Sequence, residues 1–227
     1  MPALLVAGIG TDVGKTYVSA QVLAALRARG LAVDAFKPLA SGLDPDRPAG
    51  SDPAVLLAAL GEPVTPAALA RVSPWRFRAA LAPDQAAALE GRRVDADAVV
   101  AACRARIEAA SGGWLLIETA GGIMSPLDAR TTMLDLAAAL GLPVLLVAGA
   151  YLGAISHTLT AVRVLEAAGL APVAVAVSES AATPPFESAF APIRARLAPL
   201  PVFAVRRDAR APDALMRLLM ASARPRH

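Results

Sequence analysis

The segment GIGTDVGKT, at residues 8–16 of the opening stretch MPALLVAGIGTDVGKTYVSA, decides the fold of this chain. An apolar run precedes it, and an amphipathic stretch of helical length follows it. A glycine-rich turn that ends in Gly-Lys-Thr at a helix start binds phosphate, because its backbone N–H groups and the helix dipole attract anions. In such loops the lysine, here Lys15, reaches the β- and γ-phosphates, and the threonine, here Thr16, offers its hydroxyl to Mg²⁺. Gly8 and Gly14 stand one residue further apart than in the usual motif. We therefore predict a phosphate-binding loop with an additional residue, the alternative being a plain glycine-rich turn.

The lysine content of the chain supports the same interpretation. There are 20 arginines but only two lysines, Lys15 and Lys37. In a chain so rich in arginine, a lysine is expected to remain where a compact, flexible ammonium is needed. Lys37 stands in VDAFKPLASG, residues 33–42, directly after the second apolar run. The pattern predicts a second cation aimed at the phosphates that Lys15 binds. The alternative is a lysine that extends from a turn into solvent.

Composition limits the classes of protein to consider. Apolar residues make up 56% of the 227 residues and charged residues 18%, which is typical of one compact globular domain. A net charge of +3 and nine aromatic residues do not suggest a nucleic-acid-binding face. Cys103, the only cysteine, lies in a helical pattern, so we expect it to pack as a small apolar side chain. The apolar run at residues 3–9 is too short to span a membrane. We expect a cytoplasmic protein that binds neither nucleic acid nor membrane.

Short apolar runs alternate with amphipathic segments along the chain. The runs are almost continuously apolar, as in strands that are buried on both faces of a parallel sheet. The alternation predicts a doubly wound α/β fold, with a mostly parallel sheet and flanking helices as in P-loop NTPases, in a single domain over residues 1–227. Residues 43–93 are rich in proline and contain no convincing strand, so we interpret them as an insertion of helices and loops. The predicted strands are 3–9, 31–36, 113–118, 143–149, 172–177 and 200–205, and the predicted helices are 15–30, 99–110, 132–141, 156–169 and 186–198.

Ligands of such folds bind beyond the carboxyl ends of the strands, so the residues after each run are the candidate site. Glu118 ends the third run, where a Mg²⁺ ligand is expected beside a phosphate-binding loop; a salt bridge to Lys37 or an arginine is the alternative. Asp52 either caps the helix after it or supplies a second carboxylate to the metal. A helix that begins near residues 153–156 can hold an anion, and we interpret His157 within it as structural. Together these residues predict an enzyme that uses ATP and Mg²⁺.

Several motifs taken together resemble the dethiobiotin synthetase family, and the resemblance covers nearly the whole chain. It implies a homodimer that converts 7,8-diaminopelargonic acid, CO₂ and ATP into dethiobiotin, ADP and phosphate. One amine takes up CO₂ as a carbamate, and a carbamate oxygen attacks the γ-phosphate. The second amine then closes the ring on the carbamic–phosphoric anhydride and expels phosphate. The motifs are GIGTDVGKT (8–16), KPLASG (37–42), SD (51–52), SPWRF (73–77), AALEGR (87–92), ETAGG (118–122), LPVLLVAGAYLGAISHT (142–158) and TPP (183–185).

The resemblance also implies roles for the residues at matching positions. Lys15 and Lys37 are the implied catalytic residues, which stabilise the γ-phosphoryl group and the carbamate. The implied metal ligands are Thr16, Asp52 and Glu118. The implied nucleotide-binding residues are Gly10, Thr11, Asp12, Val13, Gly14, Lys15, Thr16, Tyr17 and Ser178. The implied substrate-binding residues are Thr11, Lys37 and Ser41, with Leu152, Gly153, Ala154 and Ile155 holding the substrate carboxylate across the dimer interface.

The sequence departs from the family pattern around the nucleotide base. The family reads adenine with an asparagine after the fifth strand, whereas this chain contains no asparagine and Ser178 stands nearest. The C-terminal segment that borders the base in the family is replaced by VFAVRRDARAP, residues 202–212. A relaxed nucleotide preference is therefore our hypothesis. Elsewhere, Thr119 stands where the family has glycine, and Tyr151 where it commonly has lysine.

Three other readings of the sequence stay open. The first is a P-loop ATPase regulator of the partitioning or positioning type; such proteins carry an additional lysine early in the loop, which is absent here, and often a membrane-seeking tail. The tail ALMRLLMASARPRH, residues 214–227, is weakly amphipathic and basic. The second is a cobyrinic-acid amidating enzyme, which needs a glutaminase cysteine that Cys103 does not match. The third is a nucleotide-binding protein that has lost catalysis.

Overall fold

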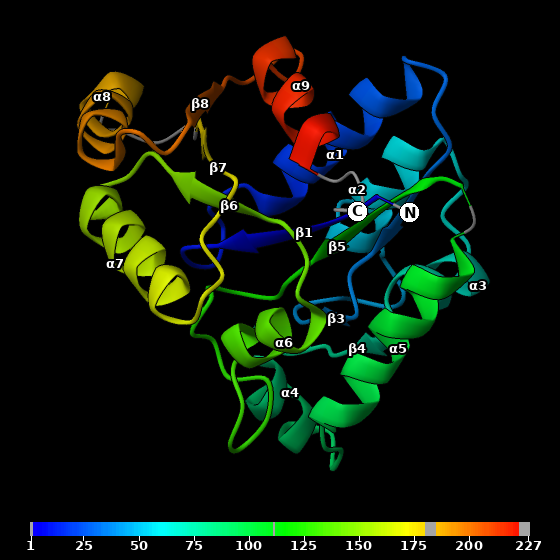
Figure 1. Cartoon of the computed structure of the whole chain (residues 1–227). Helices are drawn as coiled ribbons and strands as arrows, with labels where there is room; N and C mark the ends of the chain where they lie inside the picture. Colours follow the sequence, from blue (N-terminus) through cyan, green and yellow to red (C-terminus); the bar gives the residue numbers. More distant parts are fainter. Residues whose placement is uncertain (1, 111, 180–184, 223–227) are drawn as a thin grey trace.

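The computed structural model describes residues 2–110, 112–179 and 185–222 of the chain. Thr183 and Pro184 of the TPP motif, and the end of the tail at 223–227, lie outside the described residues. In chain order the elements are β1 (Ala3–Gly8), α1 (Lys15–Arg27), β2 (Val33–Phe36), β3 (Leu39–Ala40), α2 (Asp52–Leu60), α3 (Pro66–Val72), β4 (Trp75–Arg76), α4 (Pro83–Leu89), α5 (Ala96–Ala109), β5 (Trp114–Glu118), α6 (Met133–Leu140), β6 (Val144–Gly149), α7 (Ala154–Ala167), β7 (Ala174–Ser178), α8 (Phe186–Leu197), β8 (Val202–Val205) and α9 (Asp213–Ser222) (Figure 1).

The six long strands form one parallel sheet, in the order β2-β5-β1-β6-β7-β8. Each strand pairs with its neighbours in parallel, for example Val6 with Glu118 of β5 and with Leu145 of β6. β1 and β6 are buried at every position, as their uninterrupted apolar sequences predict. The predicted doubly wound α/β fold is confirmed, and each predicted strand overlaps an observed one.

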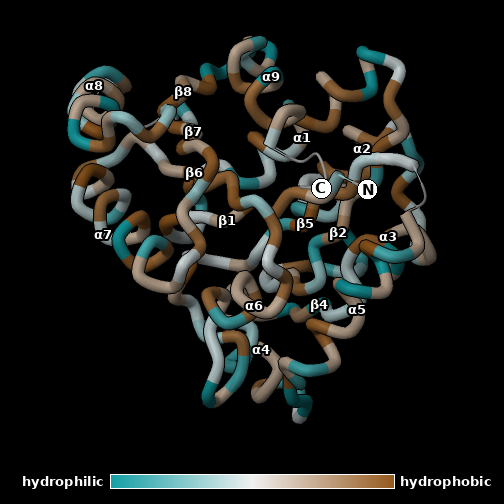
Figure 2. Tube along the Cα trace, in the orientation of Figure 1, coloured by the Kyte–Doolittle hydropathy of each residue, from teal (hydrophilic) through white to brown (hydrophobic). Residues whose placement is uncertain are grey.

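Helices cover both faces of the sheet, so that it separates two apolar cores. Buried residues of α1, α2, α3 and α9 pack against one face, and those of α5, α6, α7 and α8 pack against the other (Figure 1). Figure 2 shows the hydrophobic stretches running along the strands, while hydrophilic residues lie mostly on the outer helices and loops. Within α9, Leu215, Met216 and Leu219 are buried in the first core, so the apolar face of this part of the tail is covered by the protein itself. Across the described part of the chain, no helix is both long and apolar enough to cross a bilayer.

The proline-rich region differs from our expectation in one respect. Residues 43–93 contain the three helices α2, α3 and α4, but also the strand β4, whose residues Trp75 and Arg76 pair with Leu39 and Ala40 of β3. The expectation of no strand in this region was therefore wrong for these two residues. A two-residue strand is too short to produce a sequence pattern, since its pairing depends on a partner far away in the chain.

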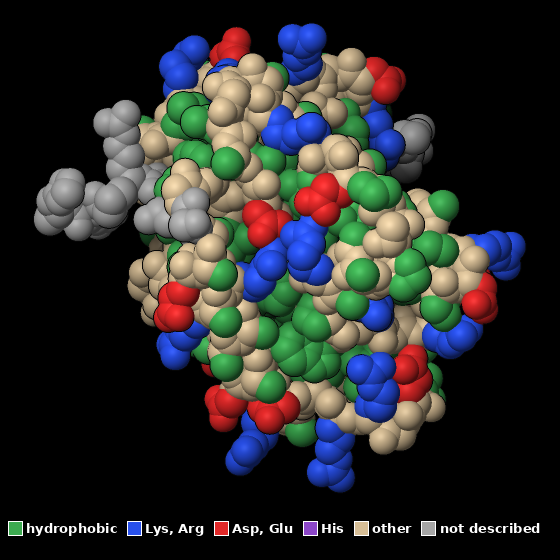
Figure 3. All heavy atoms as spheres, turned by 90° about the vertical axis from the view of Figure 1, so that its right-hand side faces the viewer, with side chains coloured by type: hydrophobic (Ala, Val, Ile, Leu, Met, Phe, Trp, Pro, Cys, Tyr) green, Lys and Arg blue, Asp and Glu red, His purple; other side chains and the backbone are tan. Residues whose placement is uncertain are grey.

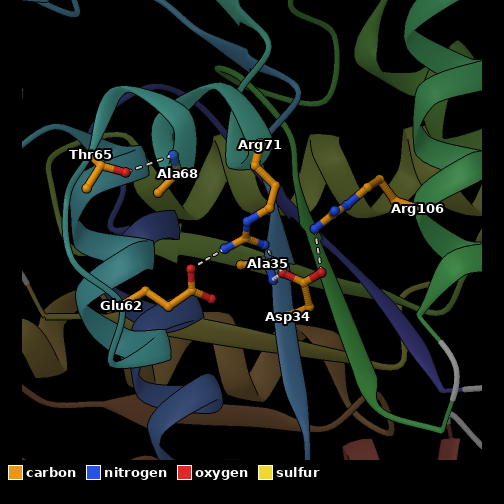
Figure 4. A network of polar contacts seen from close by, with 7 residues as sticks. All are labelled: Asp34, Ala35, Glu62, Thr65, Ala68, Arg71 and Arg106. Atoms are coloured by element: carbon orange, nitrogen blue, oxygen red, sulfur yellow. Dashed lines mark hydrogen bonds and ion pairs between the residues drawn. The ribbon is translucent and has the colours of Figure 1, made fainter.

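A network of ions ties the edge strand β2 to α3 and α5. The carboxylate of Asp34 accepts hydrogen bonds from Arg71 of α3, at 2.9 Å, and from Arg106 of α5. Arg71 also donates to Glu62, and Figure 4 shows Arg71 and Arg106 both directed at the carboxylate of Asp34. In Figure 3, which views the side of the molecule that carries α3 and α5, acidic and basic side chains adjoin near the centre of the face. The network is half-exposed, and it fastens the edge strand that leads to Lys37.

Candidate active site

The phosphate-binding loop has the strand–loop–helix context that its sequence predicts. β1 ends at Gly8, and α1 begins at Lys15 after Gly14, which is in the left-handed conformation with a φ of 91°. Asp12 in the loop also has a positive φ, 56°. The Nζ of Lys15 donates to the carbonyl oxygen of Gly10 at 2.7 Å, so the lysine folds back over the loop. The loop thus places an ammonium above the amino-terminal end of α1, where phosphate binds.

Five side chains from four segments meet beside this loop. They come from the first residues of α1 and α2, from the residue after β2 and from the last residue of β5, and the sheet order puts β5 between β2 and β1. The Nζ of Lys37 lies 2.7 Å from Oε1 of Glu118 and 2.6 Å from Oδ2 of Asp52. The structure therefore brings together the predicted residues Lys15, Thr16, Lys37, Asp52 and Glu118. The salt bridge that we gave as the alternative for Glu118 also exists, because Lys37 bonds to it directly.

Both carboxylate oxygens of Glu118 are held by hydrogen-bond donors. Glu118 is fully buried; its Oε1 accepts from the Thr16 hydroxyl at 2.6 Å as well as from Lys37. Its Oε2 accepts from the buried hydroxyl of Ser19 at 2.7 Å. Our sequence reasoning did not single out Ser19. Its spacing from Thr16 could have identified it, because residues three apart on a helix lie on the same face.

Charge coupling within this cluster shifts the pKa values of Lys37 and Asp52. Burial alone would lower the pKa of the Lys37 ammonium, but Glu118 and Asp52 outweigh it and raise that pKa above its ordinary value. Burial would likewise raise the pKa of Asp52, but Lys37 lowers it. The pairing with Lys37 thus favours the charged forms of Lys37 and Asp52 beside Glu118.

Lys15 is in a different electrostatic position. It is only 6% exposed, and burial, followed by the neighbouring Lys37 ammonium, lowers the pKa of Lys15 to about 8. Phosphate oxygens beside an ammonium favour its charged form, so a bound phosphate raises this pKa again. Affinity for a phosphate ligand should therefore fall as the pH rises above about 8, because the neutral amine must first be protonated.

We expect binding of Mg²⁺–ATP at pH 8 to take up roughly half a proton, since about half of the Lys15 side chains are neutral at that pH. Calorimetry in two buffers with different ionisation enthalpies should then give different apparent binding enthalpies. At a pH of about 6, where Lys15 is already protonated, the two buffers should agree. Equal enthalpies in both buffers at pH 8 would contradict the assignment of Lys15 to the phosphate.

The donor set of the cluster fits Mg²⁺. The hydroxyl of Thr16 and the carboxylates of Asp52 and Glu118 are hard oxygen ligands, and Lys37 already draws both carboxylates to one point. No group of three His, Cys, Asp or Glu side chains that could hold a metal occurs in the described ranges. A site of two carboxylates and a hydroxyl suits Mg²⁺ that is completed by substrate phosphates and water.

The predicted substrate-binding residues lie at the same edge of the sheet, with different exposure. The Oγ of Ser41, at the end of β3, is buried and has no hydrogen-bond partner among the described residues, so it is available to a ligand. Thr11 is exposed in the loop. Between β6 and α7, the side chain of Leu152 is 93% exposed and Gly153 caps the helix with a φ of 98°. Of the two remaining predicted residues there, Ala154 is buried and Ile155 is half-buried.

The glycines after Glu118 serve the loop itself. A Cβ at Gly122 would lie 3.0 Å from the carbonyl oxygen of Ile9 and 3.1 Å from the nitrogen of Gly10. Gly122 thus lets the segment after β5 pack against the phosphate-binding loop. Thr119, which stands at a glycine position of the family, is fully buried, and its hydroxyl has no partner among the residues that the structure describes.

Ser178 and Tyr17, two of the residues predicted to bind the nucleotide, lie on the other side of the loop. Ser178 ends β7, is 3% exposed and packs behind Gly14, where an added Cβ would lie 2.3 Å from its Oγ. Tyr17 donates its hydroxyl to the carbonyl oxygen of Arg206 at 3.0 Å. The structure therefore brings the segment after β8 next to α1, although the two are far apart in sequence.

His157 and Cys103 have the structural surroundings that we expected. Nδ1 of His157 lies 2.8 Å from the hydroxyl of Tyr151, which joins the first turn of α7 to the loop before it. Cys103 is fully buried in α5, and burial raises the pKa of its thiol to about 12, so it is not a nucleophile. This excludes Cys103 as the cysteine of a glutaminase.

Comparison with known proteins agrees with these observations. Residues 2–205 match a family model described as an AAA domain. The chain is 53% identical over 195 residues to the ATP-dependent dethiobiotin synthetase BioD of Caulobacter vibrioides (strain NA1000 / CB15N), covering 86% of this chain and 88% of that protein. It is 48% identical over 213 residues to the protein of the same name from Phenylobacterium zucineum (strain HLK1), covering 93% of this chain and 91% of that one.

The solved structures show the fold at greater distance. A chain of the MinC:MinD cell division protein complex of Aquifex aeolicus matches with a TM-score of 0.53 and 10% identity, over 98% of this chain and 87% of that one. At this identity the likeness shows the fold alone, and it does not support the regulator reading. The identity to the synthetases, together with the loop, the second lysine and the strand-end carboxylate, confirms the resemblance seen in the sequence. The chain belongs to the ATP-dependent dethiobiotin synthetase family.

Proposed function

We propose that this protein carboxylates 7,8-diaminopelargonic acid with CO₂ and closes the ring with ATP, giving dethiobiotin, ADP and phosphate as a step of biotin synthesis. The observation that carries the proposal is the meeting of Lys15, Lys37 and two carboxylates at the phosphate-binding loop, in a chain 53% identical to a synthetase of that name. The reaction gathers negative charge on a carbamate and a phosphoryl group at one place. Two ammonium groups beside the loop suit that requirement.

The first chemical step joins the substrate to CO₂. A neutral amine attacks the carbon of CO₂ and loses a proton, which leaves a carbamate with one negative charge. We assign the binding of its oxygens to Lys37 and to the hydroxyl of Ser41, which has no hydrogen-bond partner among the described residues. Both residues follow β2 at the carboxyl edge of the sheet. Binding in this way orients one carbamate oxygen toward the phosphates on the loop.

The second step transfers the γ-phosphoryl group. The carbamate oxygen attacks phosphorus, the bond to the β-phosphate oxygen breaks, and ADP leaves. Lys15 and Lys37 neutralise charge on the transferring group. Thr16, Asp52 and Glu118 would hold Mg²⁺, which would neutralise charge on the phosphate oxygens. The second amine then attacks the carbonyl carbon of the anhydride and expels phosphate, which closes the ring.

We further propose that two copies of the chain form the complete site, in the cytoplasm. Leu152 and Met124, 93% and 54% exposed, follow β6 and β5 at the carboxyl edge that holds the cluster. Large apolar side chains exposed at this edge suit burial by a second copy. In that arrangement the backbone around residues 152–155 binds the substrate carboxylate of the neighbouring subunit. Specific activity should then fall on dilution as the dimer dissociates.

Fixation of labelled bicarbonate tests the proposal directly. The protein is incubated with diaminopelargonate, Mg²⁺, ATP and [¹⁴C]bicarbonate, and the mixture is then acidified. Acid destroys a free carbamate but leaves a closed ureido ring intact, so acid-stable label requires the whole reaction. We expect stable label that depends on both ATP and diaminopelargonate. Folded protein that binds Mg²⁺–ATP but yields no stable label would contradict the proposal and favour the regulator reading.

A further inference from the structure

The first turn of α1 separates two sides of the phosphate-binding loop. Thr16 and Ser19 face Glu118 of β5, on the side where Lys37 lies. Tyr17 faces the opposite side and bonds to the segment after β8. The cations that attract the terminal phosphate are thus on the β2 and β5 side. A triphosphate bound with its terminal group there extends its nucleoside toward β7 and β8, at the other end of the sheet order.

Arg207 lies on this second side of the loop, against Tyr17. Its guanidinium carbon lies 5.5 Å from the centre of the Tyr17 ring, within the range of a cation–π contact. Its backbone N–H donates to Oε2 of Glu179 at 2.9 Å, and its Nε donates to the carbonyl oxygen of Glu179 at 3.1 Å. The residue is exposed, so the guanidinium is fastened to Tyr17 and to the end of β7 at the surface of the protein.

The neighbouring Arg206 anchors the segment that carries Arg207. Its guanidinium carbon lies 3.9 Å from the centre of the Phe186 ring, and it donates to Oε1 of Glu179 at 3.0 Å and to Glu187. Both carboxylate oxygens of Glu179 are therefore engaged, one by each arginine. Ser178 is buried behind Gly14. Among the described residues at this edge, Arg207 presents a planar cation that a base can stack on.

We propose that Arg207, held on Tyr17, is the platform on which the base of the nucleotide stacks, and that the site accepts nucleoside triphosphates with little regard to the base. Every base has a π face, so stacking on a guanidinium does not distinguish one base from another as hydrogen bonds do. The proposal rests on the nucleotide-binding half of the proposed function and is independent of the acceptor.

Binding calorimetry with Mg²⁺ and four nucleotides, ATP, CTP, GTP and UTP, tests this proposal, with inorganic tripolyphosphate as a ligand that has no base. We expect the dissociation constants of the wild type for the four nucleotides to agree within about tenfold. Arg207→Gln should lower the affinity for all four nucleotides by about tenfold, because stacking on one side chain is lost. The affinity for tripolyphosphate should stay unchanged.

Two further variants separate stacking from charge. Arg207→Lys keeps the positive charge but not the planar group, so it should lower the affinity for the nucleotides as much as Arg207→Gln does. Arg210→Gln removes an exposed arginine from the same segment and should leave every affinity unchanged. Three results would each overturn the proposal. They are a strict preference of the wild type for one base, an equal loss of tripolyphosphate affinity in Arg207→Gln, and full nucleotide affinity in Arg207→Lys. Because binding is measured, these results hold whether or not the protein makes dethiobiotin.

Discussion

Replacing Lys37 with cysteine should lower kcat for dethiobiotin formation at least about 100-fold, the loss that follows removal of one group that stabilises developing charge in a transition state. Lys37 lies within hydrogen-bond distance of both Glu118 and Asp52, and it is 3% exposed. No lysine other than Lys15 exists in the sequence to take its place. Steady-state kinetics with ATP and diaminopelargonate measure the effect.

Chemical rescue distinguishes a catalytic role of Lys37 from a structural one. Aminoethylation of the Lys37→Cys variant rebuilds an ammonium at nearly the same distance from the backbone, and kcat should recover in large part. Position 37 is almost as buried as Cys103, so the reaction is carried out in denaturant on a Cys103→Ala background and the protein is then refolded. Removing one partner of a buried ion pair is also destabilising, so cooperative unfolding of each variant is checked first. Arg163→Gln, at an arginine 84% exposed on α7, is the control and should keep full activity. Undiminished kcat in folded Lys37→Cys would contradict the catalytic role.

Glu118→Gln should weaken Mn²⁺ binding, in the presence of nucleotide, at least about 100-fold, because loss of even an outer partner of a metal site costs about 10–100-fold. The substitution keeps an oxygen that can accept from Thr16 and Lys37 but removes the charge from the centre of the cluster. Paramagnetic resonance of free Mn²⁺ measures the affinity without turnover.

A matched control and a positioning variant sharpen the test of Glu118. Glu166→Gln removes an equal charge from an exposed pair on α7 and should not change Mn²⁺ affinity. Ser19→Ala frees Oε2 of Glu118 and should weaken Mn²⁺ binding by a smaller factor, about tenfold. If Glu118→Gln bound Mn²⁺ as the wild type does, the assignment of the strand-end carboxylate to the metal would be wrong.

Much of the fold and the centre of the site could be predicted from the sequence, because they depend on local signals. Uninterrupted apolar runs identified the six sheet strands, and the rule that ligands lie at strand ends pointed to Lys37 and Glu118. What the sequence did not reveal depends on contacts between distant segments. The pairing of β4 with β3 produces no sequence pattern. The role of Ser19 depends on its contact with Glu118, which is 99 positions away in the chain.

The contacts around the proposed nucleoside position could not be predicted from the sequence either. The hydrogen bond from Tyr17 to Arg206 joins residues 189 positions apart, and the contact of Arg207 with the Tyr17 ring depends on it. The sequence revealed that the family asparagine is missing, but not which side chain lies in that region. The structure identifies that side chain as Arg207, which the spacing of residues in the sequence could not do.

Oxygen transfer from CO₂ to phosphate tests the central claim most directly. The reaction is started with C¹⁸O₂ in ordinary water, quenched before the label exchanges with solvent, and the released phosphate is analysed by mass spectrometry. If a carbamate oxygen attacks the γ-phosphorus and phosphate later leaves the carbonyl carbon, each phosphate carries one ¹⁸O and the ureido carbonyl retains the other. Phosphate without ¹⁸O, formed alongside dethiobiotin, would mean that water or another group accepts the phosphoryl group, and it would contradict the account.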